Sequence, residues 1–165
     1  MDLVTWIKHT GLHTWLAESV GWFPYPTSLA VHSMGMGIIV GLSVAVNLRI
    51  LGVVPDLPLA PLKKLFPFMW LGFWANAISG VALTFADPEK LVNWDMWIKF
   101  SCLALALVTL RLIQAQVFRN PNPEKGPLSL WSKVLAAASI FFWAGTITAG
   151  RLSAYIGCGD KQPCG

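Results

Sequence analysis

The chain of 165 residues has little charge, because Lys, Arg, Asp and Glu together make up only 12% of it. An ordinary soluble domain carries about a quarter charged residues, whereas 55% of this chain is hydrophobic. The apolar content excludes a disordered chain, and the presence of only 3 cysteines excludes a miniprotein held together by disulfides. The composition therefore predicts a small integral membrane protein.

The sequence also lacks the motifs of common soluble enzymes. It contains no phosphate-binding glycine loop that ends in Lys and Ser or Thr, no His-Glu-x-x-His, no Gly-x-Ser-x-Gly and no Cys-x-x-Cys. The 12 Lys and Arg residues are spread through short loops, which does not predict a nucleic-acid-binding face. A binding or electron-transfer subunit is therefore favoured over a stand-alone enzyme.

Four apolar stretches are long enough to cross a bilayer, which takes about 20 helical residues. They are residues 29–51, 66–86, 94–118 and 130–156. The segments between them contain the prolines and charged residues that end helices or leave the hydrocarbon layer. We therefore predict an all-α fold, an integral membrane four-helix bundle that forms a single transmembrane domain over residues 1–165.

Residues 1–23 have a different pattern. Apolar residues such as Leu3, Trp6 and Ile7 recur at helical spacing around polar ones, which is typical of an amphipathic helix in the headgroup region, interrupted here at Gly11. The segment lacks the cationic start and long apolar core of a signal peptide, so we expect it to be retained. The side chain of Thr27 or Ser28 is expected to cap the first span.

The distribution of Lys and Arg predicts the orientation, because these residues are enriched in cytoplasmic loops. One side of the bundle holds Arg49, Lys63, Lys64, Arg119, Lys125 and Lys133, and the other holds Lys8, Lys90 and Lys161. Both termini are therefore expected outside, in the periplasm. Cys158 and Cys164 lie in the tail, residues 157–165, where they can form a disulfide, bind a metal or stay reduced.

Rows of small residues mark the expected helix contacts, because small side chains allow close backbone approach in a bilayer. The rows are Ser33, Gly37 and Gly41; Gly72, Asn76 and Gly80; and Gly145, Ala149 and Ser153. They serve tight packing alone, or they also make room for a flat cofactor. Cys102 is expected to be a small packing residue.

Three polar residues lie near the outer ends of the spans, where a bilayer tolerates them poorly. At about 1.5 Å per residue, His32, Lys99 and Arg151 fall within the outer ~8 Å of the bundle, so they should converge on one layer. Asp95 is the only acid in the spans, and it can pair with Lys99 four residues later. The cations either snorkel to lipid phosphates or face a ligand that supplies negative charge.

His32 begins a stripe of residues along one helix face. The stripe continues through Met36, Ile39, Ser43 and Asn47 at spacings of four and three, which predicts an interior face. The histidine is either a hydrogen-bonded core residue or a ligand. Only His32 and Met36 of the His-Ser-Met-Gly-Met run share a side, so a copper site needs ligands from other helices.

The first functional hypothesis is a b-type haem between the helices. His32 is then the metal ligand, Met36 lies on the same face, and Lys99 and Arg151 neutralise the propionates. A second axial ligand has several candidates: His9, His13, Met69, Met96 or a second subunit. A set of tryptophans either flanks the porphyrin or forms an interfacial belt: Trp70, Trp74, Trp94, Trp97 and Trp143.

There are two further hypotheses, one that uses the same residues and one that uses none of them. In one, a quinone or another small carbonyl-bearing or anionic ligand binds to His32, Lys99 and Arg151 as hydrogen-bond donors. In the other, the protein has no chemistry and is a structural subunit, in contact with other membrane subunits or with copies of itself.

The first span carries a distinctive run, Ala-Val-His-Ser-Met-Gly-Met-Gly over residues 30–37, followed by Asn-Leu-Arg-Ile-Leu-Gly over residues 47–52. This run resembles an uncharacterised bacterial family of four-helix inner-membrane proteins, which have a valine-histidine pair and an Asp-Leu-Arg-Leu-Leu-Gly-like end. Lys99 and Arg151 are similar to the family's lysine in span three and arginine in span four, whereas Asn47 replaces the family's acid. The resemblance covers about residues 22–155.

More distantly, the pattern is similar to the membrane domains of copper-resistance D proteins. That resemblance implies a bacterial inner-membrane location and a metal or redox role that faces the periplasm.

Overall fold

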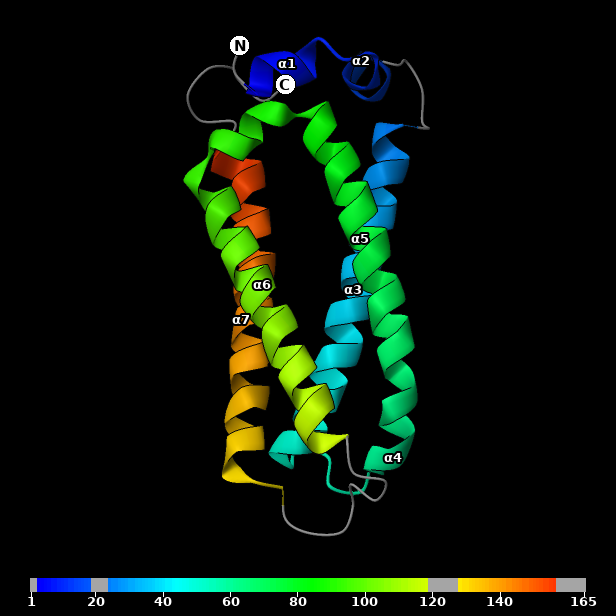
Figure 1. The fold of residues 1–165 in the computed structure, drawn as a ribbon, viewed down its shortest axis with the longest axis vertical. Helices are drawn as coiled ribbons and strands as arrows, with labels where there is room; N and C mark the ends of the chain where they lie inside the picture. Colours follow the sequence, from blue (N-terminus) through cyan, green and yellow to red (C-terminus); the bar gives the residue numbers. More distant parts are fainter. Residues whose placement is uncertain (1–2, 19–23, 119–127, 157–165) are drawn as a thin grey trace.

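The structure, a computed structural model, describes residues 3–18, 24–118 and 128–156. Every regular element in these ranges is a helix, which confirms the all-α fold. Four helices are long and apolar enough to cross a membrane, and they are α3 (Tyr25–Leu51), α5 (Phe66–Ala86), α6 (Trp94–Val117) and α7 (Leu130–Ile156). They form the predicted bundle of four antiparallel helices (Figure 1).

The start of the first span differs from the prediction. α3 begins at Tyr25 rather than at residue 29, because Pro26 lies in the first turn of the helix, where its missing N–H removes no hydrogen bond. The predicted cap is therefore wrong. Pro24 occupies the cap position without a side-chain hydrogen bond, and the Ser28 hydroxyl instead donates to the Pro24 carbonyl at 2.7 Å.

Two short helices lie across one end of the bundle (Figure 1). α1 (Leu3–Lys8) and α2 (Gly11–Glu18) are separated near Gly11, as predicted. Only part of their apolar surface is buried. Ile7 and Leu16 are buried, whereas Trp6 and Trp15 are exposed. The arrangement suits a segment that packs on the bundle and still presents aromatic rings to its surroundings.

The remaining short helices define the two ends of the bundle. α4 (Leu59–Leu62) and the 3-10 helix η1 (Lys63–Leu65) connect α3 to α5, and the 3-10 helix η2 (Pro88–Val92) connects α5 to α6. We call the two ends the α4 end and the η2 end. α1 and α2 lie at the η2 end, where Lys8 Nζ is 2.5 Å from Glu89 Oε1 and His13 Nδ1 is 2.8 Å from the Phe85 carbonyl oxygen.

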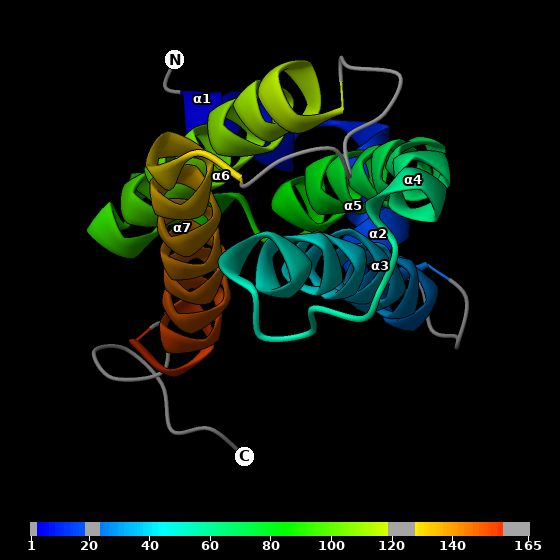
Figure 2. The ribbon, with the colours of Figure 1, turned by 90° about the horizontal axis from the view of Figure 1, so that it is seen from below.

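The long helices pack as two hairpins, α3 with α5 and α6 with α7 (Figure 2). In the first hairpin, a Cβ added to Gly35 would lie 2.7 Å from the Gly72 carbonyl oxygen and from the Asn76 nitrogen. This contact bears out the predicted packing role of Gly72 and Asn76. In the second hairpin, a Cβ on Gly145 would lie 3.1 Å from Cys102 Sγ, which fits the packing role predicted for that cysteine.

The predicted row of Ser33, Gly37 and Gly41 is not a helix contact. A Cβ on Gly37 or Gly41 would meet no atom of the described residues within 4 Å, and both glycines are exposed. α3 instead approaches α5 through Gly35, which lies on a different face. The glycines of this helix recur on two faces, so spacing alone selects the wrong one.

The two hairpins join through buried polar contacts in the half nearest the α4 end. Trp143 Nε1 donates to Ser43 Oγ at 3.0 Å, and Asn47 Nδ2 donates to Ser139 Oγ at 3.0 Å. Ser43 and Asn47 are buried together with Ile39, so the predicted interior face of α3 is confirmed.

A further contact links α5 to α6 in the same half. The Arg111 guanidinium lies over the Trp70 ring, 3.8 Å from its centroid, which is a cation–π arrangement. This role of Arg111 was not predicted from the sequence.

Candidate functional site

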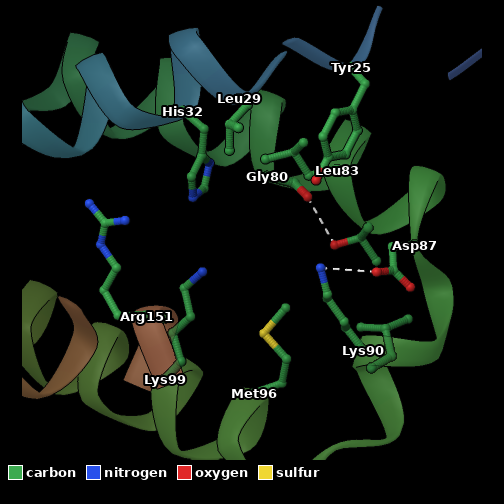
Figure 3. Close-up of a pocket in the computed structure, with 13 residues that line it drawn as sticks. Tyr25, Leu29, His32, Gly80, Leu83, Asp87, Lys90, Met96, Lys99 and Arg151 are labelled. Atoms are coloured by element: carbon green, nitrogen blue, oxygen red, sulfur yellow. Dashed lines mark hydrogen bonds and ion pairs between the residues drawn. The ribbon is translucent and has the colours of Figure 1, made fainter. Parts of the chain in front are cut away.

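A cavity of about 330 Å³ lies between the hairpins at the η2 end. His32 from α3, Lys99 from α6 and Arg151 from α7 all line it, and Figure 3 shows the three side chains pointing into the same space. The structure thus brings together the three polar residues that the sequence placed in one layer.

A second cavity, of about 450 Å³, adjoins the first, because His32, Lys99 and Arg151 line both. It extends along α3 past Met36 and Gly37. Met36 is half-buried and lies beside His32, as predicted. It lines the second cavity together with His32. We call the two adjoining cavities the cationic cleft.

Helix α5 fixes the position of the His32 ring. His32 Nδ1 lies 2.9 Å from the Asn76 carbonyl oxygen, which only accepts, so Nδ1 carries the proton and donates it. A Cβ on Gly80 would lie 3.1 Å from His32 Cε1, so the glycine makes room for the ring. With Nδ1 engaged, Nε2 of the neutral ring is left as an acceptor or metal ligand, and in the imidazolium it is a donor.

Lys99 reaches the cleft along a second glycine. A Cβ on Gly150 would lie 3.5 Å from Lys99 Cε and 3.7 Å from Nζ, so the lysine stem passes over bare backbone of α7. Lys99 is half-buried, whereas Arg151 on the same wall is exposed. The ammonium is therefore held within the protein rather than extended over its surface.

The predicted pairing of Lys99 with Asp95 is wrong. Ion pairs among the described residues join Lys8 to Glu89 and Lys90 to Asp87, the latter at 2.9 Å. Asp95 is buried in the first turn of α6, and neither of its carboxylate oxygens has a hydrogen-bond partner in the described part of the chain. The spacing of four residues fits the pair, and the negative charge of Asp95 acts on Lys99 through space, but the two groups form no ion pair within 4 Å.

The cationic cleft therefore carries unbalanced positive charge. Lys90 and Asp87 line it as a matched pair (Figure 3). Lys99 and Arg151 form no ion pair with any carboxylate in residues 3–18, 24–118 and 128–156. Two cations and a histidine thus surround a space with one local carboxylate, and that carboxylate is already neutralised.

The predicted metal-site residues lie in different places. No three His, Cys, Asp or Glu side chains among the described residues lie close enough to hold a metal ion. Met96 lines the cleft, whereas Met69 is buried in the core. His13 contacts the Phe85 carbonyl instead. Cys158 and Cys164 lie outside the described residues.

The tryptophans proposed to flank a porphyrin do not line the cleft. This holds for all five, Trp70, Trp74, Trp94, Trp97 and Trp143. Trp143 is in the core, and Trp94 and Trp97 are exposed, with exposed fractions of 60% and 66%. Exposed tryptophans near the helix ends suit an interfacial belt.

Some residues of the site were missed in the sequence. Leu83 and Thr84 on α5 also line the cleft and had no predicted role, whereas Met96, a predicted ligand candidate, lies three positions before Lys99 on a shared face. Gly150 precedes Arg151 and could have been read as room for a neighbouring side chain. The carbonyl of Asn76 has no sequence signal, because any residue at that position supplies the same group.

Comparisons with family models, with curated proteins and with solved structures gave no match to this chain. The class of the protein therefore comes from its fold, and it is a multi-pass membrane protein with four apolar helices. The resemblance to an inner-membrane family stays a prediction.

Proposed function

We propose that this protein binds a ligand with a carboxylate or phosphate group in the cationic cleft. The observation that supports the proposal is the convergence of Lys99 and Arg151 beside His32, with no ion pair to a described carboxylate. A cation within a membrane-spanning helix is costly unless it is paired or hydrated. An anionic ligand supplies the missing charge.

The placement of Lys99 supports a ligand over snorkelling. A snorkelling lysine lays its stem along the protein surface and extends its ammonium to the headgroups. Lys99 instead is half-buried, with its stem against Gly150. Arg151 is exposed, so it can bind the same anion from the rim of the cleft.

The proposal is tested by titrating purified protein in dodecyl maltoside with dodecyl phosphate and measuring binding by calorimetry. Lys99→Met and Arg151→Met should each weaken binding by about 10- to 100-fold, since a charged hydrogen bond is worth about 1.5–3 kcal/mol. Lys64→Met is the matched control, because Lys64 is exposed in η1 at the other end of the bundle. Equal affinities for the wild type and the two cleft variants contradict the proposal.

A b-type haem is the second candidate ligand, and the orientation of His32 favours it. Metal-ligating histidines usually donate their other ring N–H to a carbonyl or carboxylate, as His32 does to Asn76. Lys99 and Arg151 would hold the propionates, and Met96 lines the opposite wall (Figure 3). The histidine and the two cations fit this group, and Met96 is the one described methionine in the lining of the first cavity that could supply a further ligand. A bound haem would supply one-electron redox chemistry.

The haem candidate is tested by absorption spectra of oxidised and dithionite-reduced protein, expressed with haem precursor. A stoichiometric Soret band that disappears in His32→Ala supports it. A featureless spectrum of the wild-type protein contradicts it, and a band unchanged in His32→Ala removes His32 as the ligand.

We further propose that the protein lies in the bacterial inner membrane with its η2 end in the periplasm. Basic residues support this orientation. Arg49, Lys63, Lys64 and Lys133 lie at the α4 end, against Lys8 and Lys90 at the η2 end. Alkaline phosphatase fused after residue 165 should be active, and fused after residue 125 inactive. The reverse pattern contradicts the orientation.

A further inference from the structure

The side-chain hydrogen bonds that join α3 to α7 in the described residues lie in one half of the bundle. Near the α4 end, the Trp143–Ser43 and Asn47–Ser139 hydrogen bonds hold α7 against α3. From Met36 on α3 and Thr146 on α7 toward the η2 end, the same two helices line the second cavity of the cationic cleft. The pair of helices is thus closed at one end and separated at the other.

The space between α3 and α7 is open on the side of the bundle. Ser33 and Gly37 on one wall and Ile147 on the other are exposed, the last with an exposed fraction of 41%. A Cβ on Gly37 would meet no described atom within 4 Å. At about 1.5 Å per residue, Ser33 and Gly37 lie roughly 12 and 18 Å along α3 from Tyr25. The opening therefore faces the hydrocarbon of the bilayer.

The end of the bundle is covered by contrast. α1 and α2 cross the η2 end, where Lys8 is paired with Glu89 and the His13 ring contacts the Phe85 carbonyl (Figure 1). The Lys90–Asp87 pair also lies on the cavity wall near this end. No described residue of α1 or α2 lines either cavity.

The two ends of the cleft differ in chemistry. His32, Lys99 and Arg151 gather where both cavities meet, and the part along Met36, Gly37 and Ile147 offers apolar side chains and bare backbone. A charged group would bind where His32, Lys99 and Arg151 gather. A hydrocarbon chain would be buried along Met36, Gly37 and Ile147. These are the two requirements of an amphiphile.

We infer that the ligand of the cationic cleft is an anionic amphiphile that enters from the bilayer between α3 and α7. Its acidic head group lies between Lys99 and Arg151, and its hydrocarbon tail lies against Gly37 and Ile147. This inference rests on the proposed function and adds to it the class of the ligand and its route. The head group can be a phosphate or a carboxylate, since the two cations bind either.

The tail is tested with a pair of glycine variants. Gly37→Leu places a side chain in the second cavity, whereas Gly41→Leu adds the same side chain one turn further along α3, where the glycine is equally exposed and does not line the cleft. Dodecyl phosphate should bind Gly37→Leu about tenfold more weakly than wild type, and Gly41→Leu with wild-type affinity. Inorganic phosphate should bind the wild type at least 100-fold more weakly than dodecyl phosphate, because burying each CH₂ is worth about 0.8 kcal/mol.

The outcomes separate this inference from the proposed function. If Lys99→Met weakens binding but Gly37→Leu does not, and inorganic phosphate binds as tightly as dodecyl phosphate, the site takes a soluble anion and the inference is overturned. If Lys99→Met and Arg151→Met change nothing, the proposed function itself fails. Equal losses in Gly37→Leu and Gly41→Leu also overturn the tail placement.

A labelling experiment gives a readout that does not depend on how the leucine variants fold. Gly37→Cys and Gly41→Cys proteins are treated with a maleimide, and modification is read by peptide mass spectrometry at each position. Dodecyl phosphate should protect Cys at position 37 at least fivefold and leave position 41 unprotected. Equal reactivity at position 37 with and without the probe overturns the inference.

Discussion

The two halves of this bundle are built from the same four helices but differ in how they treat polar groups. Near the α4 end, side-chain contacts join the helices: Trp143 bonds Ser43, Asn47 bonds Ser139, and Arg111 lies over Trp70, although Asn47 Oδ1 and Trp70 Nε1 have no hydrogen-bond partner in the described residues. Near the η2 end, Lys99 and Arg151 surround a cavity and form no ion pair with a described carboxylate. The α4 half thus holds the two hairpins together, and the η2 half contains the site for which we propose a ligand.

The largest expected effect comes from breaking the α4 half. Trp143→Ala should destabilise the protein by about 3 kcal/mol, because it leaves a large cavity and removes the partner of Ser43. The measurement is the unfolding free energy in mixed micelles. Trp97→Ala is the matched control and should cost under about 1 kcal/mol, since the Trp97 side chain is 66% exposed. Similar losses for both would mean that Trp143 does not anchor the hairpins.

The next effect tests the contact within one hairpin. Gly35→Ala should destabilise by about 2 kcal/mol, because its Cβ would lie 2.7 Å from backbone atoms of α5 that cannot move aside. Gly41→Ala adds the same methyl group where no described atom lies within 4 Å, so it should be neutral or slightly stabilising. Thermal unfolding of the two variants in detergent checks this. Equal midpoints would show that α3 and α5 are not in close contact at Gly35.

The smallest expected effect is a gain in stability, and it tests the contrast between the two halves. Lys99→Met should raise the unfolding free energy of the ligand-free protein by about 1 kcal/mol, because it removes a half-buried cation without an ion-pair partner in the described residues. The same variant should lose affinity for dodecyl phosphate. A loss of stability in Lys99→Met would indicate that the lysine has a structural role.

The sequence predicted the parts of this molecule that depend on periodicity and length. Three of the four spans begin at the predicted residue, since each starts where loop prolines and polar residues give way to an apolar run. The interior stripe from His32 to Asn47 and the shared layer of His32, Lys99 and Arg151 follow from helical geometry and depth alone.

Other features depend on which helix faces which, and sequence spacing does not contain that information. Gly35, rather than the row of Gly37 and Gly41, contacts α5, because glycines recur on two faces of α3. Lys99 follows Asp95 by one helical turn, yet the lysine lies against Gly150 in the cleft and forms no ion pair with the buried acid. The carbonyl that orients His32 belongs to the backbone of Asn76, so the residue pattern does not predict it.

The central claim, that the cleft binds an acidic head group between Lys99 and Arg151, is tested most directly by solid-state NMR. Protein labelled with ¹⁵N at lysine and arginine side chains is reconstituted with dodecyl phosphate, and dipolar coupling between ³¹P and ¹⁵N is measured. We expect coupling to one lysine and one arginine nitrogen, lost from the lysine in Lys99→Met and from the arginine in Arg151→Met. Coupling that persists in both variants, or none in the wild type, would contradict it.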